Sequence, residues 1–118
     1  MSSREMINSS EAEPPKYVVV LMTAPTGKGR EIARILVERK LCACINVVSG
    51  VYSVYWWQGR VEDGEEELLI CKTLREKLNE LQQAIREVHP YEIPEIIAIE
   101  IVKGLREYLE WVRSSIAK

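Results

Sequence analysis

The stretch that decides the fold is LCACINVVSGVYSVYWWQGRVEDGEEELLICKT, residues 41–73. Val, Ile, Tyr and Trp dominate residues 41–57, which predicts one long strand with a bend near Ser49-Gly50. Gln58-Gly59 is a tight-turn signal, so a return strand is expected over residues 60–73. A hairpin of this length exceeds one compact sheet layer, and long exposed strand edges are a liability in a monomer. The pattern therefore predicts an oligomer.

The segments on either side of the hairpin complete one pattern. Tyr17–Met22 is a continuous β-branched and apolar run, typical of a strand that is covered on both faces. After the hairpin, Thr73 with Glu76 forms a capping box, which predicts a helix that ends before Pro90. The other expected elements are a helix over 28–40, a strand over 93–102 and a last helix over 105–116. The order β-α-β-β-α-β plus a C-terminal helix is the α+β, ferredoxin-like arrangement.

Length and composition limit the function classes. The chain has 118 residues, which is enough for one domain, and we expect it to span 17–118 after a flexible leader over 1–16 that is rich in Ser, Glu and Pro. The formal net charge is −2 and no basic run occurs, so neither nucleic acid nor a membrane surface is an expected partner. No apolar segment resembles a signal peptide or a membrane span, which predicts a cytoplasmic protein.

Catalytic motifs are not evident. His89 is the only histidine, so no set of nucleophile, histidine and acid can be assembled. The string Thr26-Gly27-Lys28-Gly29 lacks the spacer and the Gly-Lys-Ser/Thr end of a phosphate loop. The sequence therefore predicts a protein that is not an enzyme and has no obligatory cofactor.

The string HPYEIPE, residues 89–95, is the most unusual segment. It lies between a predicted helix and a predicted strand, and loops in such positions often carry function. Imidazole is a good ligand for copper, zinc or nickel, and a carboxylate can complete such a site. His89 and Glu92 are therefore candidate metal ligands, although the residues alone favour a rigid turn held by two prolines.

Three cysteines and an aromatic cluster offer further candidates. Cys42 and Cys44 alternate, so both thiols are expected on one face of a strand, where they would hold a soft ion such as Cu(I) or, as the favoured interpretation, pack as small apolar groups. Cys71 is expected in the core. Tyr55, Trp56 and Trp57 form an aromatic strand, which favours a subunit interface over ordinary core packing.

With this order of elements, the chain resembles the CutA (CutA1) family over residues 17–118. The resemblance is carried by these strings: Thr23-Ala24-Pro25, Leu41-Cys42-Ala43-Cys44-Ile45-Asn46, Ser53-Val54-Tyr55-Trp56-Trp57-Gln58-Gly59, Lys72-Thr73 and His89-Pro90-Tyr91-Glu92-Ile93-Pro94-Glu95. It implies a ferredoxin-like fold, a tight homotrimer like that of the signal-transducing PII proteins, a cytoplasmic location and a role in tolerance of copper and other divalent cations.

The resemblance is incomplete at the family's metal site. Family members credited with copper binding carry Cys before Thr-Ala-Pro and a His-His pair before Pro-Tyr, whereas this chain has Met22 and Val88 there. His89 keeps the second histidine, and the Met22 thioether remains a weaker candidate ligand for Cu(I). The first hypothesis is thus a non-enzymatic metal-response protein that binds copper or another divalent cation through His89, Glu92 and Met22.

Two alternatives stay open. One is a PII-like trimeric sensor whose inter-subunit clefts bind an anion or a metabolite, with lining residues Tyr55, Trp56, Trp57, Lys72, Tyr91 and Glu95. The other is a structural scaffold that presents a surface to a protein partner.

Overall fold

The computed structural model describes residues 6–8 and 16–117. Its centre is a four-stranded antiparallel sheet in the order β3-β4-β2-β5. The strands are β2 (Tyr17–Pro25), β3 (Cys44–Trp57), β4 (Arg60–Leu74) and β5 (Ile96–Glu100), and the helices are α1 (Gly29–Glu38), η1 (Arg75–Lys77), α2 (Leu78–Val88) and α3 (Arg106–Ile116). This order confirms the predicted α+β, ferredoxin-like arrangement with an extra C-terminal helix.

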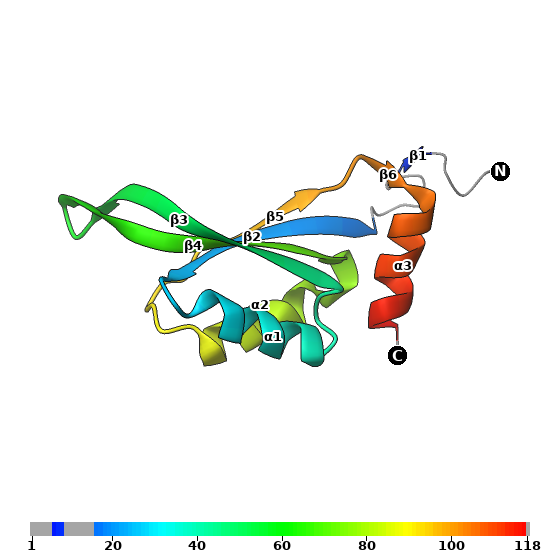
Figure 1. Cartoon of the computed structure of the whole chain (residues 1–118), viewed down its shortest axis with the longest axis horizontal. Helices are drawn as coiled ribbons and strands as arrows, with labels where there is room; N and C mark the ends of the chain where they lie inside the picture. Colours follow the sequence, from blue (N-terminus) through cyan, green and yellow to red (C-terminus); the bar gives the residue numbers. More distant parts are fainter. Residues whose placement is uncertain (1–5, 9–15, 118) are drawn as a thin grey trace.

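Helices α1 and α2 cover one face of the sheet, as Figure 1 shows. Each is amphipathic, and the apolar stripes of both meet side chains of β2 and β4 in the main core. Fully buried members of this core are Val20, Met22, Leu36, Leu69, Leu81 and Ile85. Burying one such side chain contributes about 2 kcal/mol of transfer free energy, so this layer holds the domain together.

A buried carboxylate fixes the start of α1. Glu67 of β4 accepts a hydrogen bond from the Gly29 amide at 2.7 Å. This contact suits an acidic side chain because the first amides of a helix have no intrahelical partner and carry partial positive charge. A Cβ atom at position 29 would lie 2.5 Å from Glu67 Oε1 and 3.0 Å from Val47 Cγ1. Only glycine therefore allows α1 to approach the sheet this closely.

The opposite face of the sheet is covered at one end only. There α3 packs Leu109, Val112 and Ile116 against Tyr17 and Leu74. A two-stranded sheet lies beside α3, where β1 (Met6–Asn8) pairs with β6 (Lys103–Leu105). Part of the segment predicted as a flexible leader thus pairs with the domain, and the prediction for 1–5 and 9–15 lies outside the described residues.

The β3–β4 hairpin projects from the end of the molecule opposite α3 (Figure 1). A register shift between Val48 and Val51 forms the predicted bend. At the tip, Gln58 and Gly59 have positive φ angles of 51° and 78°. Positive φ at both central residues is the geometry that two-residue hairpin turns require, so the predicted turn is confirmed.

The capping-box prediction at Thr73 is wrong. Strand β4 continues to Leu74 because it pairs with Tyr17 at the start of β2, and α2 begins only after the η1 turn. The Thr73 hydroxyl is buried and donates to the Leu41 carbonyl at 2.7 Å. A full ladder of strand hydrogen bonds here outweighs a local capping signal.

The cysteines also differ from expectation. Cys42 and Cys71 are buried as predicted, but they are joined by a disulfide. Strand β3 starts at Cys44 rather than Leu41, so strand alternation does not relate the first two cysteines. Cys44 pairs with Lys72, next to Cys71 on β4, and therefore faces away from the main core. The prediction that both thiols share a face is wrong.

Candidate functional site

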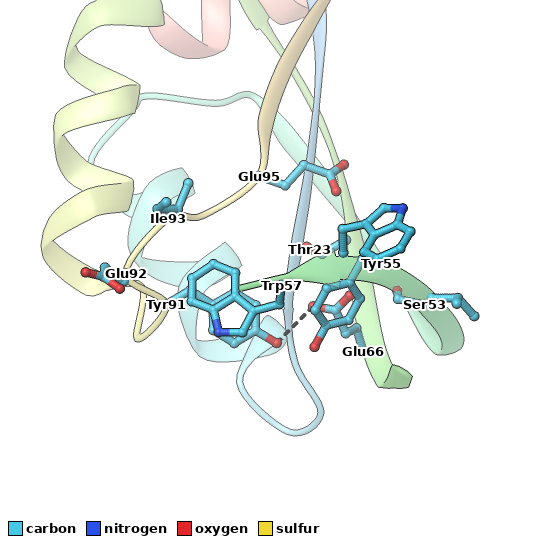
Figure 2. Close-up of a pocket in the computed structure, with 11 residues that line it drawn as sticks. Thr23, Ser53, Tyr55, Trp57, Glu66, Tyr91, Glu92, Ile93 and Glu95 are labelled. Carbon is cyan, nitrogen blue, oxygen red and sulfur yellow. Dashed lines mark hydrogen bonds between the residues drawn. The ribbon is translucent and has the colours of Figure 1, made fainter. Parts of the chain in front are cut away.

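A cleft lies between the hairpin and the loop that follows α2. Its volume is about 560 Å³, within the range of small-molecule sites. It is lined by residues from β2, β3, β4 and the 89–95 loop: Thr23, Ser53, Val54, Tyr55, Trp56, Trp57, Glu66, Tyr91, Glu92, Ile93 and Glu95. Figure 2 shows these side chains gathered around the loop and the neighbouring strands.

His89 fixes the loop beneath the cleft. Helix α2 ends at Val88, and His89 continues in extended conformation. Its Nε2 atom lies 2.6 Å from the Thr23 carbonyl oxygen, and its Nδ1 atom accepts from the Tyr91 amide at 3.1 Å. A carbonyl can only accept, so Nε2 carries the hydrogen and Nδ1 is the acceptor. Both ring nitrogens are thus used to hold the loop against β2.

Tyr91 links the loop to the hairpin. Its hydroxyl donates to Glu66 Oε2 at 2.8 Å, the dashed line in Figure 2. Its ring packs on the His89 ring with the centroids 4.7 Å apart. Burial first, then the hydrogen bond and charge of Glu66 and the field of Tyr55, raise the pKa of Tyr91 to about 12. The phenol therefore stays protonated at neutral pH and keeps donating to Glu66.

The cleft combines acidic and aromatic side chains. Glu66, Glu92 and Glu95 are its charged residues, and its lining, as far as the structure describes the chain, contains no Lys, Arg or His. In Figure 2, Glu92 points away from Glu66 across the loop. The aromatic residues Tyr55, Trp56 and Trp57 are all exposed in the single chain. The arrangement can therefore accept hydrogen bonds and attract positive charge, and its described lining offers no positively charged side chain that would pair with an anion.

Most residues predicted to line a cleft are brought together. Tyr55, Trp56, Trp57, Tyr91 and Glu95 all line it, and so does Glu92, which was predicted as a metal ligand.

Lys72 does not take part, because its ammonium group hydrogen-bonds to Asn46 Oδ1 and lies 3.8 Å from Cys44 Sγ. The cation that an anion-binding cleft would need is therefore engaged elsewhere on the sheet.

The three candidate metal ligands occupy different environments. Met22 is buried in the core beneath α1 and α2, His89 is engaged by two hydrogen bonds, and Glu92 lies at the cleft. Among the residues that the structure describes, no three His, Cys, Asp or Glu side chains come close enough to hold one metal ion. The residues of a single chain therefore do not by themselves fit a metal centre.

Sequence reasoning missed Glu66, Thr23 and Ser53. Glu66 is part of the acidic run from Asp63 to Glu67, and strand alternation alone does not show which of these carboxylates faces the loop. The register shift in β3 places Glu66 opposite Val51. Because a bulge changes which side chains share a face, the hairpin sequence does not locate this residue.

The fold and the cleft define a class of protein. It is a small ferredoxin-like α+β protein with a long aromatic hairpin, an incompletely covered sheet and an acidic cleft where loop and hairpin meet. None of the helices in residues 16–117 combines the length and apolar character needed to cross a membrane.

Comparison with known proteins agrees with this class. The family described as "CutA1 divalent ion tolerance protein" matches residues 18–115. The chain is 45% identical to the divalent-cation tolerance protein CutA of Thermus thermophilus over 98 residues, which are 82% of this chain and 95% of that protein. The chain belongs to the CutA1 family.

A plant relative and a solved structure are also similar to this chain. The chloroplastic protein CutA 1 of Oryza sativa is 40% identical over 115 residues, which are 97% of this chain and 64% of that protein. The chain thus spans less than two thirds of the plant relative. A solved structure described as the PII-like protein CutA from Nostoc sp. PCC 7120 in apo form superposes with a TM-score of 0.78 at 37% identity, covering 84% of this chain and 96% of that one.

Proposed function

We propose that this protein acts as a non-enzymatic homotrimer in the response to divalent cations, and that the cleft between hairpin and loop is its ligand site. The carrying observation is the composition of that cleft, with carboxylates and aromatic rings and no basic side chain among its described lining residues. Such a site attracts cations. The names of family relatives, which refer to divalent-cation tolerance, support the same role for this chain.

Assembly is supported by the surface that a single chain leaves open. Ile97 and Ile99 on the edge strand β5 are 50% and 49% exposed, and Trp56 near the hairpin tip is 74% exposed. Apolar side chains of this size on edge strands favour pairing with other copies. The trimeric state is proposed from the family resemblance. A sedimentation experiment that finds only monomers at micromolar concentration would contradict this part.

A cytoplasmic location remains a prediction. The Cys42–Cys71 disulfide counts against a cytoplasmic location, because disulfides are rare in reducing compartments.

The metal contact is proposed at the cleft carboxylates, with ligands shared between subunits. The alternative site, His89 with Glu92 and Met22, would require the imidazole to give up its hydrogen bond to Thr23 or the one from Tyr91. His89 is therefore proposed as a positioning residue that keeps Tyr91 and Glu92 in place.

A calorimetric titration with Cu(II), Cu(I) and Zn(II) tests this proposal. The variants are Glu92→Gln, Glu95→Gln and His89→Gln, in which the glutamine amide can still donate to Thr23. Glu107→Gln on α3, away from the cleft, is the matched charge control. We expect each cleft glutamate variant to weaken metal binding about tenfold, while His89→Gln and Glu107→Gln change it little.

Two results would decide against it. Loss of binding only in His89→Gln would favour direct ligation by the imidazole, and no binding of any of these ions by the wild-type oligomer would remove metal binding from the proposed function.

A further inference from the structure

We propose that the cleft also binds an organic cation, an ammonium or guanidinium group carried on a small carbon skeleton. This inference rests on the proposed function in that it takes the cleft as a cation site, and it adds a second chemical class of ligand. Such a ligand is larger than a metal ion and opposite in charge to the anion expected for a PII-like sensor.

The charge of the cleft favours a cation. Glu66, Glu92 and Glu95 are the charged groups among the described residues that line the cleft. An anion would be repelled by these carboxylates, and Lys72, the cation predicted to attract it, is bonded to Asn46 instead. A positively charged ligand is therefore selected by both attraction and exclusion.

The hydrogen-bonding groups of the cleft also favour a cation. Carboxylates can only accept, and the phenol hydrogen of Tyr91 is donated to Glu66 rather than to a ligand. Because the pKa of Tyr91 is raised to about 12, this donation persists across the neutral range. The charged groups open to a ligand are therefore carboxylate acceptors, which match the N–H groups of an ammonium or guanidinium ion, whereas the donors of the lining are neutral hydroxyl and indole groups.

The volume of the cleft and its aromatic lining favour an organic ligand. A volume of about 560 Å³ is far larger than a single metal ion needs, since metal ligands must lie within about 2 to 2.6 Å of the ion. Indole rings do not ligate hard divalent ions, but Tyr55, Trp56, Trp57 and Tyr91 all line the same space with aromatic surface. A cation over such rings gains about 0.5 to 2 kcal/mol from the ring quadrupole. Together the walls fit a charged head with an apolar body.

The experiment compares three ligands of similar size and different charge. Benzylammonium, benzyl alcohol and phenylacetate are titrated at pH 7 into the assembled full chain, with tryptophan fluorescence and calorimetry as readouts. We expect the cation to bind at least about tenfold more tightly than the alcohol, and phenylacetate to give no saturable signal. Raising the salt concentration should weaken binding of the cation and leave that of the alcohol unchanged.

Variants assign the binding to the cleft. Trp57→Leu removes a ring and Glu66→Gln removes a charge while it leaves an acceptor for Tyr91, and each should weaken the cation about three- to tenfold. Trp111→Leu and Glu107→Gln on α3 are the matched controls and should leave its affinity unchanged. Circular dichroism of each variant confirms that the fold is kept.

Three outcomes would overturn the inference. The first is that phenylacetate binds as tightly as the cation or more tightly. The second is that the affinity for the cation is unchanged in Trp57→Leu and Glu66→Gln. The third is that the ammonium ion does not bind to an oligomer whose tryptophans are shielded from quenching by acrylamide. The last result would show that a second copy of the chain fills the cleft. Titration of the same samples with Zn(II) separates the two proposals, because retained metal binding without organic-cation binding would defeat this inference and leave the proposed function standing.

Discussion

The two halves of the β3–β4 hairpin are paired by the same ladder but differ in what covers them. In the half near α1 and α2, side chains of β4 alternate between buried and partly buried, with Leu69 and Cys71 fully enclosed. In the distal half, beyond the bulge at Val48, side chains on both faces are exposed, including Val61 on one face and Tyr55 on the other. Backbone pairing is equally regular in both halves, so burial is what separates them.

The distal half therefore depends on contacts from outside the single chain. A two-stranded ribbon is marginally stable in water without a further layer. Its charged residues Glu62, Asp63 and Glu65 protect it against uncontrolled edge pairing. Its aromatic residues favour a specific interface with another molecule. The cleft borders this half, so assembly or ligand binding is expected to stabilise the conformation of the candidate site.

The largest difference between the halves is expected in their mutational sensitivity. Leu69→Ala in the covered half should lower the free energy of unfolding by about 3 to 4 kcal/mol, since it removes a fully buried side chain and leaves a cavity. Val61→Ala on the same strand, 59% exposed in the distal half, should change the stability of the dissociated chain by less than about 0.5 kcal/mol. Urea unfolding at one fixed protein concentration measures both, and equal losses would contradict the comparison.

The second effect concerns the disulfide, which joins Cys71 in the covered half to Cys42 just before β3. Cys42 and Cys71 are 29 residues apart in sequence, and closing a loop of this length constrains the unfolded chain by about 3.6 kcal/mol. Reduction with dithiothreitol should therefore lower the denaturation midpoint and leave the hairpin tip unaffected.

Thiol counting in denaturant provides the control for the disulfide. One reactive thiol, that of Cys44, is expected before reduction and three afterwards. Three thiols in protein purified without reductant would show that the bond does not form.

The same comparison explains what could be predicted from the sequence. The elements that pack around the covered half were predictable. In α2, Leu78, Leu81 and Ile85 follow a helical period, and Tyr17–Met22 is an apolar strand, so local pattern and global packing agree. The capping signal at Thr73 misled because β4 extends by pairing with β2, a contact between residues far apart in the chain. The disulfide was missed for a similar reason, since spacing alone does not show which cysteines meet.

The site was predictable only in part. The aromatic string and the 89–95 loop were recognised by their composition, and the structure brings Tyr55, Trp57, Tyr91 and Glu95 to one cleft. The role of His89 was not predictable, because its two hydrogen bonds are made to backbone groups, which any sequence possesses. Lys72 does not line the cleft of the single chain, because the register of β3 and β4, which pairs it with Cys44, follows from three-dimensional pairing.

A third, smaller effect should appear in assembly. Trp56→Ser in the distal half removes a large exposed aromatic side chain, and such residues contribute about 1 to 2 kcal/mol or more to a protein interface. The dissociation midpoint in a dilution series should rise about tenfold, as measured by sedimentation velocity. Trp111→Ser on α3 is the matched control and should leave the midpoint unchanged, so equal shifts in both variants would mean that the distal half is not the interface.

The smallest effect should come from the hydrogen bond that joins the 89–95 loop to the hairpin. Tyr91→Phe removes the hydroxyl that donates to Glu66 and should cost less than about 1 kcal/mol at neutral pH, because Tyr91 is partly exposed. The pH dependence is more informative. The folded pKa of about 12 exceeds the ordinary value of 10.0, so the associated stability is fully present below pH 10 and is lost as the pH rises towards 12.

Phenolate absorbance during an alkaline titration measures this directly. In wild-type protein one of the five tyrosines should ionise near pH 12, and this late step should be missing in Tyr91→Phe. Glu66→Gln should lower the pKa of Tyr91 without restoring it to 10.0, because burial, the largest cause of the shift, remains. A Tyr91 that titrates normally in wild-type protein would mean that the loop and the hairpin are not joined in solution, and the cleft would then lack the acceptor-rich wall on which its preference for cations depends.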